Sequence, residues 1–505
     1  MSPNESSQPE LVFGLVGPIG VDMTSVQVTL ESSLRSVGYT PHTIHLTKIV
    51  PAAIPGFLPY PKTYDDKIDY VNKLCEATDR NDILARFAIL EICGIRQKIN
   101  EKNEVPDAPN LPVPGTAFII RQLKREQEIE FLRSIYGRRF IQISATIDHQ
   151  TQVKSVESIV TGEKPELYGS LLRKKVDELI EKDQEEGGND YGQRLSKTFQ
   201  HGDFFVDASH TQTLSQQMNR FVRALFGANE VSPTIDEFGS YLAKAAAIRT
   251  VDLSRQVGAA ILTSQGDIIS LGCNEVPRAG GGNYWASDSN PQRDIDRKFD
   301  ANKLATSQII SDFVKTIHIH GSLKGSPDDL LADEKFQKLL KKSLVSDITE
   351  FGRMNHAEMS ALMDAVRLGR SVEGSTIYVT TYPCHNCAKH LIGSGVKRIV
   401  YIEPYPKSRA MALHDDAITV DQQSTEKVVL SHFHGIAPRR YRDIFEKGSR
   451  KTKEGRAKVW YEDDPKPLVG DRFSLHVLFE PEVVKQLAEA LEKINDTAAK
   501  TPAEA

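Results

Sequence analysis

The sequence predicts an α/β protein with two domains, and three observations support this class. The chain has 505 residues, which is more than one hydrophobic core usually accommodates. Its hydrophobic content of 39% and charged content of 26% are ordinary for a globular protein. Apolar runs also alternate with helical patterns, for example at 116–121, 126–137 and 140–144. Such alternation is typical of a parallel sheet flanked by helices.

Charge, cysteine usage and hydropathy restrict the class further. A net charge of -5 argues against a protein coated for nucleic-acid binding, although local basic patches are compatible with it. Five cysteines, two of them needed as thiolates, fit a reducing cytoplasm. The first ten residues are polar, and no uninterrupted apolar run approaches a membrane span. We therefore expect a cytoplasmic protein without a membrane segment, with a flexible tail at 495–505.

The first element is an apolar run at 11–16, predicted to be a buried strand, which leads into a glycine-containing turn and a helix to about residue 36. Strand, turn and helix in this order form the layout of a P-loop, which holds phosphates with backbone N–H groups and a helix N-terminus. The candidate nucleotide-binding residues are Gly17, Gly20 and Thr24.

Two positions depart from the P-loop pattern. Asp22 stands where the second glycine belongs, and Met23 replaces the lysine that reaches the β- and γ-phosphates. Phosphoryl transfer is therefore not expected. The strings of 116–144 also resemble small nucleotide kinases. Three interpretations stay open for residues 1–232: a degenerate P-loop kinase-like domain with a parallel sheet, a residual nucleotide-binding site, or coincidence.

Two short motifs of the second half predict a hydrolytic zinc site. His356 precedes Glu358 by two residues, and Pro383 leads into Cys384 and Cys387. One imidazole and two thiolates supply three zinc ligands and leave the fourth tetrahedral position for water. The pattern is the one shared by zinc nucleobase deaminases, in which the glutamate carries protons and does not bind the metal.

A structural zinc knuckle is the alternative for these motifs. Such knuckles usually supply four ligands in two close pairs, and the chain has no second Cys-x-x-Cys pair. His356 is predicted to open a helix to about 369, and Cys384 a second one to about 395. The positive end of a helix favours thiolate over thiol, which suits a ligand.

The remaining elements expected in the second half surround these motifs. A helix is predicted at 236–250, a β-hairpin at 255–274, and strands at 376–380, 397–402 and 427–433. Between the hairpin and His356, residues 287–345 are rich in Asp and Lys and are predicted to form a helical surface arm, for assembly or for covering a substrate.

Four stretches of the second half resemble deoxycytidylate deaminases of the cytidine deaminase superfamily, and the resemblance spans roughly 236 to 445. These stretches are 255–259, 272–278, 355–358 and 382–388. It implies an α/β/α domain with a mixed five-stranded sheet over 233–494. It also implies a site with zinc on His356, Cys384 and Cys387, Glu358 as proton shuttle and Asn274 at the sugar.

The combination of a P-loop kinase-like half with this deaminase half is similar to bacterial phage-defence dCTP deaminases. That resemblance implies depletion of the deoxycytidine nucleotide pool during infection. It also implies a small inhibitory RNA as a partner, because some members are held inactive by one. Deaminases of this fold commonly assemble, so a homo-oligomer is expected.

Arginines beside the deaminase motifs are candidate phosphate contacts, because the guanidinium fork matches phosphate oxygens. They are Arg278, Arg439 and Arg440. The basic run at 439–458 has two interpretations, contact with phosphate or RNA and a solvated face. The choice between dCTP and dCMP as substrate stays open.

Three alternative functions remain. The first is a housekeeping dCMP deaminase. The second is a deaminase of tRNA or single-stranded DNA, which needs a long basic track lined with aromatic side chains. The third is a regulatory scaffold in which the first half senses a nucleotide or RNA and the zinc site is secondary.

Overall fold

The computed structural model describes residues 8–500, with gaps at 55–56, 58–60, 106–110, 187–188, 324, 342, 344, 346–347, 349, 406, 459–464 and 470–474. For residues 51–53, 493 and 495–500 it describes only the backbone. Over the described residues, no helix combines the length and the apolar content that crossing a bilayer requires. The chain divides into two compact units. Unit 1 comprises Met1–Thr234 and His434–Ala505, and unit 2 comprises Ile235–Phe433.

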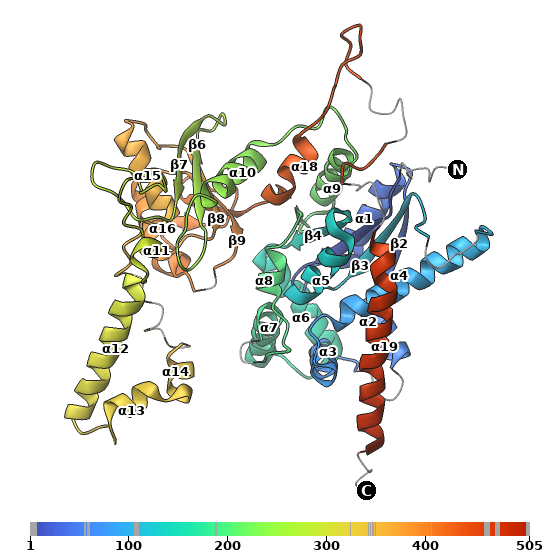
Figure 1. The fold of residues 1–505 in the computed structure, drawn as a ribbon, viewed down its shortest axis with the longest axis horizontal. Helices are drawn as coiled ribbons and strands as arrows, with labels where there is room; N and C mark the ends of the chain where they lie inside the picture. Colours follow the sequence, from blue (N-terminus) through green and yellow to red (C-terminus); the bar gives the residue numbers. More distant parts are fainter. Residues whose placement is uncertain are drawn as a thin grey trace. The chain divides into compact units, whose positions relative to one another are not determined.

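Unit 1 is built on a six-stranded sheet (Figure 1). Its strands run in the order β12-β5-β4-β1-β3-β2, and every neighbouring pair is parallel except β12 with β5. The central strands are almost wholly buried, as expected where helices cover a parallel sheet. The strands are β1 (Leu11–Val16), β2 (Thr40–His45), β3 (Thr116–Arg121), β4 (Phe140–Thr146), β5 (Phe204–Asp207) and β12 (Gly435–Ile436).

Helices pack against this sheet. One core joins α1 and α9 to apolar residues of β1, β3 and β4, while α5 and α8 contact β4 and β1. The helices are α1 (Met23–Arg35), α2 (Leu46–Ala53), α3 (Tyr64–Thr78), α4 (Ile83–Lys102), α5 (Glu126–Tyr136), α6 (His149–Glu163), α7 (Gly169–Gln184), α8 (Leu195–Phe199), α9 (Thr211–Leu225), α18 (Tyr441–Phe445) and α19 (His476–Lys500), with short 3-10 turns at Gly137–Arg139 and Pro438–Arg440.

The chain returns to unit 1 after unit 2. β12 pairs with β5, and Ile436 and Ile444 belong to the core that contains β1 and α9. Helix α19 packs against α4, where the buried guanidinium of Arg96 bonds to Glu480. The sequence predicts that the second domain ends near residue 494. Because of these buried contacts with unit 1, the second unit ends at Phe433 instead.

The expected tail at 495–505 also differs from the structure. Helix α19 continues to Lys500, and residues 501–505 lie outside the described part of the chain.

Unit 2 is built on a second six-stranded sheet, in the order β10-β11-β9-β8-β6-β7. β6 is antiparallel to β7 and β8, and the other pairs are parallel, so the sheet is mixed. It has six strands instead of the expected five because the two residues of β10 pair with β11. The strands are β6 (Gly258–Leu262), β7 (Ile268–Cys273), β8 (Thr376–Thr381), β9 (Arg398–Glu403), β10 (Ile418–Thr419) and β11 (Val428–His432).

Helices cover both faces of this sheet. Ile261 and Val379 share a core with α15 and α16, whereas the neighbouring positions Gly258 and Tyr378 lie against α10. Because strand side chains alternate between faces, the unit has three layers, helix, sheet and helix. The helices are α10 (Ile235–Ala247), α15 (Ala357–Arg367), α16 (His385–Gly393) and α17 (Ala410–Leu413).

The residues between β7 and α15 include a helical arm, as the sequence predicted for 287–345. In Figure 1 the helices α12, α13 and α14 follow one another beyond α11. The buried residue of α12 is Val314, so most of this helix is accessible to solvent. The helices are α11 (Asp294–Arg297), α12 (Ala301–Ile319), α13 (Pro327–Ala332) and α14 (Glu334–Leu340).

Candidate metal centre and pocket

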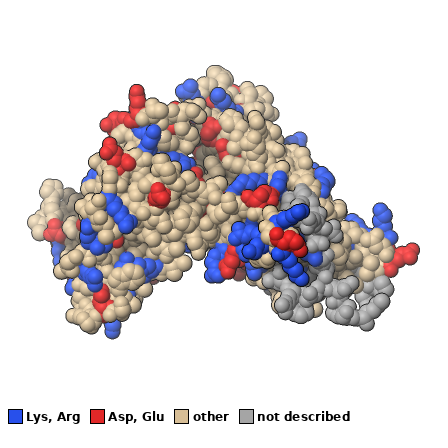
Figure 2. All heavy atoms as spheres, turned by 90° about the horizontal axis from the view of Figure 1, so that it is seen from above, with Lys and Arg blue, Asp and Glu red and all other residues tan. Residues whose placement is uncertain are grey.

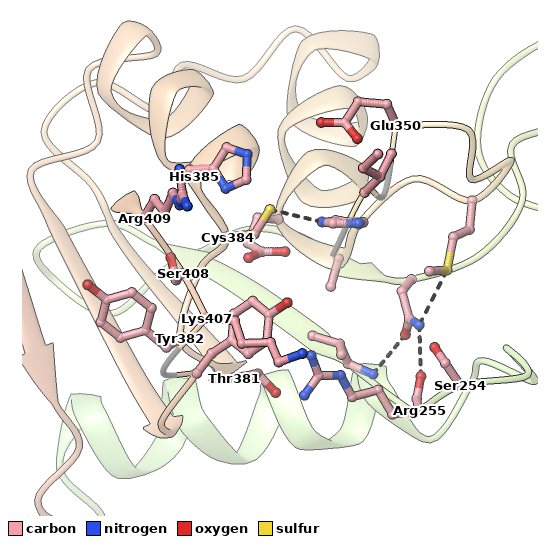
Figure 3. A pocket seen from close by; sticks show the side chains of 18 of the residues that line it. Ser254, Arg255, Glu350, Thr381, Tyr382, Cys384, His385, Lys407, Ser408 and Arg409 are labelled. Atoms are coloured by element: carbon pink, nitrogen blue, oxygen red, sulfur yellow. Dashed lines mark hydrogen bonds between the residues drawn. The ribbon is translucent and has the colours of Figure 1, made fainter. Parts of the chain in front are cut away.

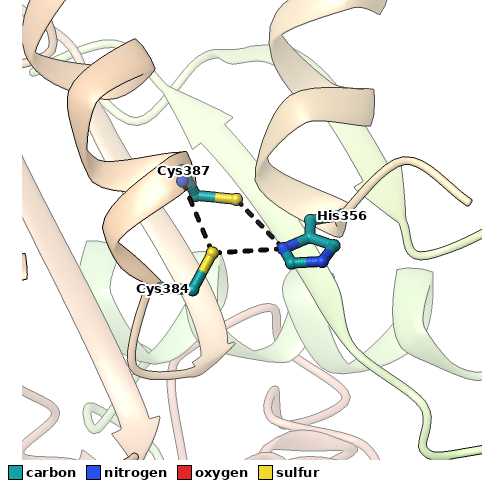
Figure 4. A group of neighbouring side chains, drawn as sticks. All are labelled: His356, Cys384 and Cys387. Atoms are coloured by element: carbon teal, nitrogen blue, oxygen red, sulfur yellow. Dashed lines mark hydrogen bonds between the residues drawn. The ribbon is translucent and has the colours of Figure 1, made fainter. Parts of the chain in front are cut away.

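The two zinc motifs meet at the starts of two helices of unit 2. His356 is the N-cap residue of α15, and Cys384 is the N-cap residue of α16, after β8 has ended at Thr381. His356 Nδ1 lies 3.3 Å from Cys384 Sγ and 3.4 Å from Cys387 Sγ. Figure 4 shows the three side chains pointing toward one another. The sequence prediction that these residues converge is therefore confirmed.

The donor set of this cluster fits zinc. The ligand atoms of His356, Cys384 and Cys387 all lie within 4.8 Å of one another. The hydrogen bond from the Cys387 thiol, together with that from His356, lowers the pKa of Cys384 to about 3. A thiolate is therefore present at neutral pH. Two sulfurs and one imidazole are ligands that suit Zn²⁺, and three protein ligands leave one tetrahedral position for water.

Glu358 lies next to the cluster, in the first turn of α15. Its side chain is 4% exposed, and it lines the same pocket as His356 and Cys384. Burial raises the pKa of its carboxyl above the ordinary value. A buried carboxyl with a raised pKa is suited to hold a proton and pass it on near neutral pH.

A pocket of about 660 Å³ opens at the cluster (Figure 3). Apart from the cluster and Glu358, its lining comes from the residues before β6 and after β7, from the segment before α15 and its start, from the β8–α16 connection, and from the loop between β9 and α17 with the end of α17. They are Ser254, Arg255, Val257, Asn274, Ile348, Glu350, Met354, Ala357, Thr381, Tyr382, His385, Tyr405, Lys407, Ser408, Arg409 and Leu413. The volume is within the usual range for small-molecule sites.

Asn274 lines this pocket, as expected for a residue that contacts substrate. Its amide oxygen accepts a hydrogen bond from the backbone N–H of Val257 at 2.7 Å, and its amide nitrogen donates to the carbonyl of Arg255 at 2.8 Å. The side chain is 3% exposed. Asn274 thus fixes the segment that carries Arg255 into the pocket wall.

The arginines predicted as phosphate contacts do not line the pocket. Arg278 is exposed and pairs with Asp288 at 3.1 Å. Arg440 is 5% exposed in unit 1, and its three guanidinium nitrogens bond to Asp203, Asp443 and the carbonyl of Phe140.

Arg439 has partners in unit 1 as well. It pairs with Asp203 at 3.3 Å and donates to the carbonyl of His201. Asp203 is fully buried, so the arginine-rich segment after Pro438 serves to neutralise a buried carboxylate. The sequence suggested a phosphate site because the arginine fork fits phosphate and carboxylate oxygens alike.

The P-loop candidates follow β1 in unit 1: Gly17 and Gly20 lie between β1 and α1, and Thr24 lies in the first turn of α1. Gly20 has φ +96°, and an added Cβ would lie 3.1 Å from the carbonyl oxygen of Gln152. A Cβ at Gly17 would lie 3.2 Å from the carbonyl of Ala145. Thr24 donates its backbone N–H to Asp22.

Sequence reasoning missed three cationic side chains of the pocket, Arg255, Lys407 and Arg409. Lys407 and Arg409 follow β9, the parallel neighbour of β8, and β8 leads to Cys384. The carboxyl ends of neighbouring parallel strands meet at one edge of a sheet, where ligands bind. Their position directly after β9 could therefore have indicated that Lys407 and Arg409 lie at the pocket.

Comparison with known proteins matches part of unit 2 to one family. Residues 234–403 match the model of the cytidine and deoxycytidylate deaminase zinc-binding region. The metal of this site is accordingly Zn²⁺, and His356, Cys384 and Cys387 form a cluster suited to hold it.

Individual relatives are similar over shorter stretches. The deoxycytidylate deaminase of Enterobacteria phage T2 is 50% identical over 54 residues, which are 11% of this chain and 29% of that protein. ComE operon protein 2 of Bacillus subtilis is 36% identical over 80 residues, 15% of this chain and 42% of that protein. A probable deoxycytidylate deaminase of Drosophila melanogaster is 28% identical over 178 residues, which are 34% of this chain and 63% of that protein. The chain thus spans less than two thirds of each relative.

Among solved structures, the dCMP deaminase of cyanophage S-TIM5 in complex with dCMP and dUMP aligns with 40% of this chain and 100% of its own. The sequence identity is 16% and the TM-score is 0.23.

Proposed function

We infer that residues 234–403, which match the zinc-binding region of cytidine and deoxycytidylate deaminases, are the catalytic part of an enzyme that hydrolytically deaminates deoxycytidine nucleotides. The reaction would convert dCMP or dCTP to dUMP or dUTP and release ammonia. The observation that carries this proposal is the meeting of His356, Cys384 and Cys387 with the buried Glu358 at one pocket. The deoxycytidylate deaminases among the relatives support the nucleotide class of the substrate.

The chain's own residues would divide the chemistry as follows. His356, Cys384 and Cys387 hold Zn²⁺, which when bound lowers the pKa of a water molecule from 15.7 to about 7. Glu358 takes one proton from the attacking water and delivers it to N3 of cytosine, while the C4–O bond forms. The same carboxyl then takes the second proton from the new C4 hydroxyl and delivers it to the amine at C4, so the C4–N bond breaks and ammonia leaves as the C4 carbonyl forms. The raised pKa of Glu358 supports this shuttle, because a carboxyl that binds a proton readily can carry it between two sites.

We propose that the cationic side chains of the pocket bind the substrate phosphates. The guanidinium of Arg255 lies over the ring of Tyr405, 5.0 Å from its centroid, and Asn274 holds the Arg255 carbonyl. Lys407 and Arg409 approach the pocket from the loop after β9 (Figure 3). Three cations provide for more than one phosphate, which supports dCTP as a substrate in addition to dCMP.

Ammonia release by zinc-loaded protein given deoxycytidine, dCMP, dCTP, CTP or a cytosine-containing oligonucleotide would test the substrate class. Arg255→Met is expected to raise the KM for dCMP and dCTP without a comparable change for deoxycytidine, because only the phosphates lose a partner. Arg278→Met, an exposed arginine of the same unit outside the pocket lining, is the matched control. Equal loss on nucleotide and nucleoside would refute the phosphate role, and turnover of the oligonucleotide alone would refute the nucleotide proposal.

We further propose that unit 1 is a degenerate nucleotide kinase-like domain and that the enzyme depletes the deoxycytidine nucleotide pool during phage infection. The parallel sheet of unit 1 supports the first point. The resemblance of the two-part architecture to phage-defence deaminases supports the second. Cellular dCTP measured after infection should fall with the active protein and stay level with Glu358→Gln. Equal dCTP in both strains would count against the defence role.

A small RNA and a second copy of the chain are the proposed partners, in a reducing cytoplasm that keeps the zinc thiolates intact. Exposed cations at 450–458 support RNA contact, although both signs of charge are spread over the face seen in Figure 2. Apolar side chains exposed on α12, such as Phe313 at 62%, support self-assembly. Binding of RNA that does not weaken with salt would argue against phosphate contacts, and a monomeric mass in solution would exclude the oligomer.

A further inference from the structure

Acceptors of the same chain bind backbone N–H groups of the loop between β1 and α1 and of the first turn of α1. The N-cap residue Asp22 accepts the backbone N–H groups of Thr24 and Ser25 at 3.0 and 3.1 Å. The hydrogen bond from the Ser25 hydroxyl is the main reason why the pKa of Asp22 lies below its ordinary value. The carboxylate thus stays charged at the helix N-terminus, where a P-loop would hold a phosphate.

A second carboxylate, that of Asp183 on α7, lies against the same loop and is fully buried. Its Oδ2 accepts the backbone N–H of Ile19 at 2.7 Å. Its Oδ1 accepts the Tyr64 hydroxyl and the Gln193 side-chain amide, each at 3.1 Å. The ammonium of Lys124 lies 2.9 and 3.1 Å from the two oxygens. Four groups, three of them side chains from separate segments, therefore converge on one carboxylate.

Lys124 supplies the ammonium group that the loop itself lacks. The sequence has Met23 where a P-loop has its lysine, but the Lys124 ammonium reaches the loop from the end of β3 and also donates to the Gly17 carbonyl at 2.8 Å. Burial and the charge of Asp183 hold the pKa of Tyr64 well above its ordinary value, so its hydroxyl remains a donor. A backbone N–H, an ammonium, a hydroxyl and an amide form a donor set suited to an oxyanion.

We propose that this loop is an oxyanion site that the chain fills with its own Asp183 carboxylate. Wild-type unit 1 accordingly takes no nucleotide phosphate there. A phosphate would have to displace a tethered, buried anion and then lie near the negative charge of Asp22, with the Lys124 ammonium as its counter-charge. Removal of the Asp183 side chain leaves the same donors around an empty space and creates a site for a small free oxyanion.

The test uses the full-length, zinc-loaded protein and inorganic phosphate as the probe. Equilibrium dialysis with radiolabelled phosphate should show no saturable binding to wild type and saturable binding to Asp183→Gly. Thermal unfolding should show a lower Tm for Asp183→Gly, which phosphate or acetate raises more than sodium chloride of equal ionic strength. Asp177→Gly, at an exposed position of the same helix, controls for the cost of glycine in α7. Asp183→Asn should bind no phosphate, because its amide fills the space.

Two results would overturn the proposal. One is saturable binding of phosphate or ATP to wild type that Lys124→Met abolishes, since this would make the loop an open nucleotide site. The other is a folded Asp183→Gly that gains neither phosphate binding nor an anion-specific rise in Tm. If Asp183→Gly does not fold, the comparison of wild type with Lys124→Met still decides, because absence of Lys124-dependent binding supports the proposal and its presence refutes it.

Discussion

Gly272 allows the helix that carries the Glu358 carboxyl, the proposed proton carrier, to rest on the sheet, and Gly272→Ala tests this placement. A Cβ at residue 272 would lie 2.2 Å from the carbonyl oxygen of Ala357 and 2.4 Å from the backbone nitrogen of Ala361. An unstrained carbon–oxygen contact is about 3.3 Å, so the start of α15 must withdraw by roughly 1 Å. Ala357 stands between His356 and Glu358, so both move with it. A misplacement of about 1 Å can cost on the order of 10²-fold in rate.

The assay is ammonia release from dCMP and dCTP, together with bound zinc and the free energy of unfolding from urea denaturation. Gly272→Ala should lower kcat by about 10²-fold and stability by about 1–3 kcal/mol through overpacking. Gly239→Ala is the control, because its Cβ would press on the Tyr378 ring, on the α10 face of the sheet, at 2.3 Å. It should lower stability but leave kcat per folded molecule unchanged. A native kcat in Gly272→Ala would show that a Cβ at residue 272 does not displace Glu358.

Three further predictions concern the metal and the charges of unit 1. Chelation of zinc should abolish ammonia release and lower the Tm, and added Zn²⁺ but not Mg²⁺ should restore both. Arg96→Met removes the guanidinium that neutralises the buried carboxylates of Glu10 and Glu480. His476 still pairs with Glu10 and the Tyr136 hydroxyl still donates to Glu480, but the arginine charge is lost, so urea denaturation should show a loss of about 3–5 kcal/mol. Burial alone would raise the pKa of Asp203, but the charges of Arg440 and Arg133 outweigh it and lower that pKa. The stability from this carboxylate is thus complete above its unfolded pKa of about 3.9 and is lost as pH falls through the folded value, so Asp203→Asn should flatten acid denaturation monitored by circular dichroism.

The zinc site was predictable from sequence because its chemistry is local. His356 and Glu358 are two residues apart, Cys384 and Cys387 three, and each pair begins a helix whose apolar face packs on the sheet. Both the start of a helix and the spacing of metal ligands depend on residues that lie close together in the sequence. The long apolar strands of both sheets were also predictable, because short apolar runs between turn residues fix them locally. The strands that were missed, β2, β10 and β12, have no such run: β2 is mostly exposed or half-buried, and β10 and β12 have two residues each.

The missed features depend on contacts between distant segments. Residues 434–494 were predicted to continue the deaminase half, but Ile436 and Ile444 lie in the core of unit 1. Arg440 read as a phosphate ligand, and only the fold shows that Asp203, 237 residues away, is its partner. Arg255 appeared to be a strand residue because nothing in its neighbours indicates the pocket that it lines.

In the proposed function, Glu358 carries protons for the deamination of a deoxycytidine nucleotide at a zinc centre. The most direct measurement is ammonia release from dCMP and dCTP by zinc-loaded wild type and by Glu358→Gln, with the zinc content of both proteins determined. We expect turnover by the wild type and a rate lower by about 10²–10⁴-fold in the variant, with zinc retained. Near-native turnover by a zinc-loaded Glu358→Gln would show that Glu358 is not the proton carrier.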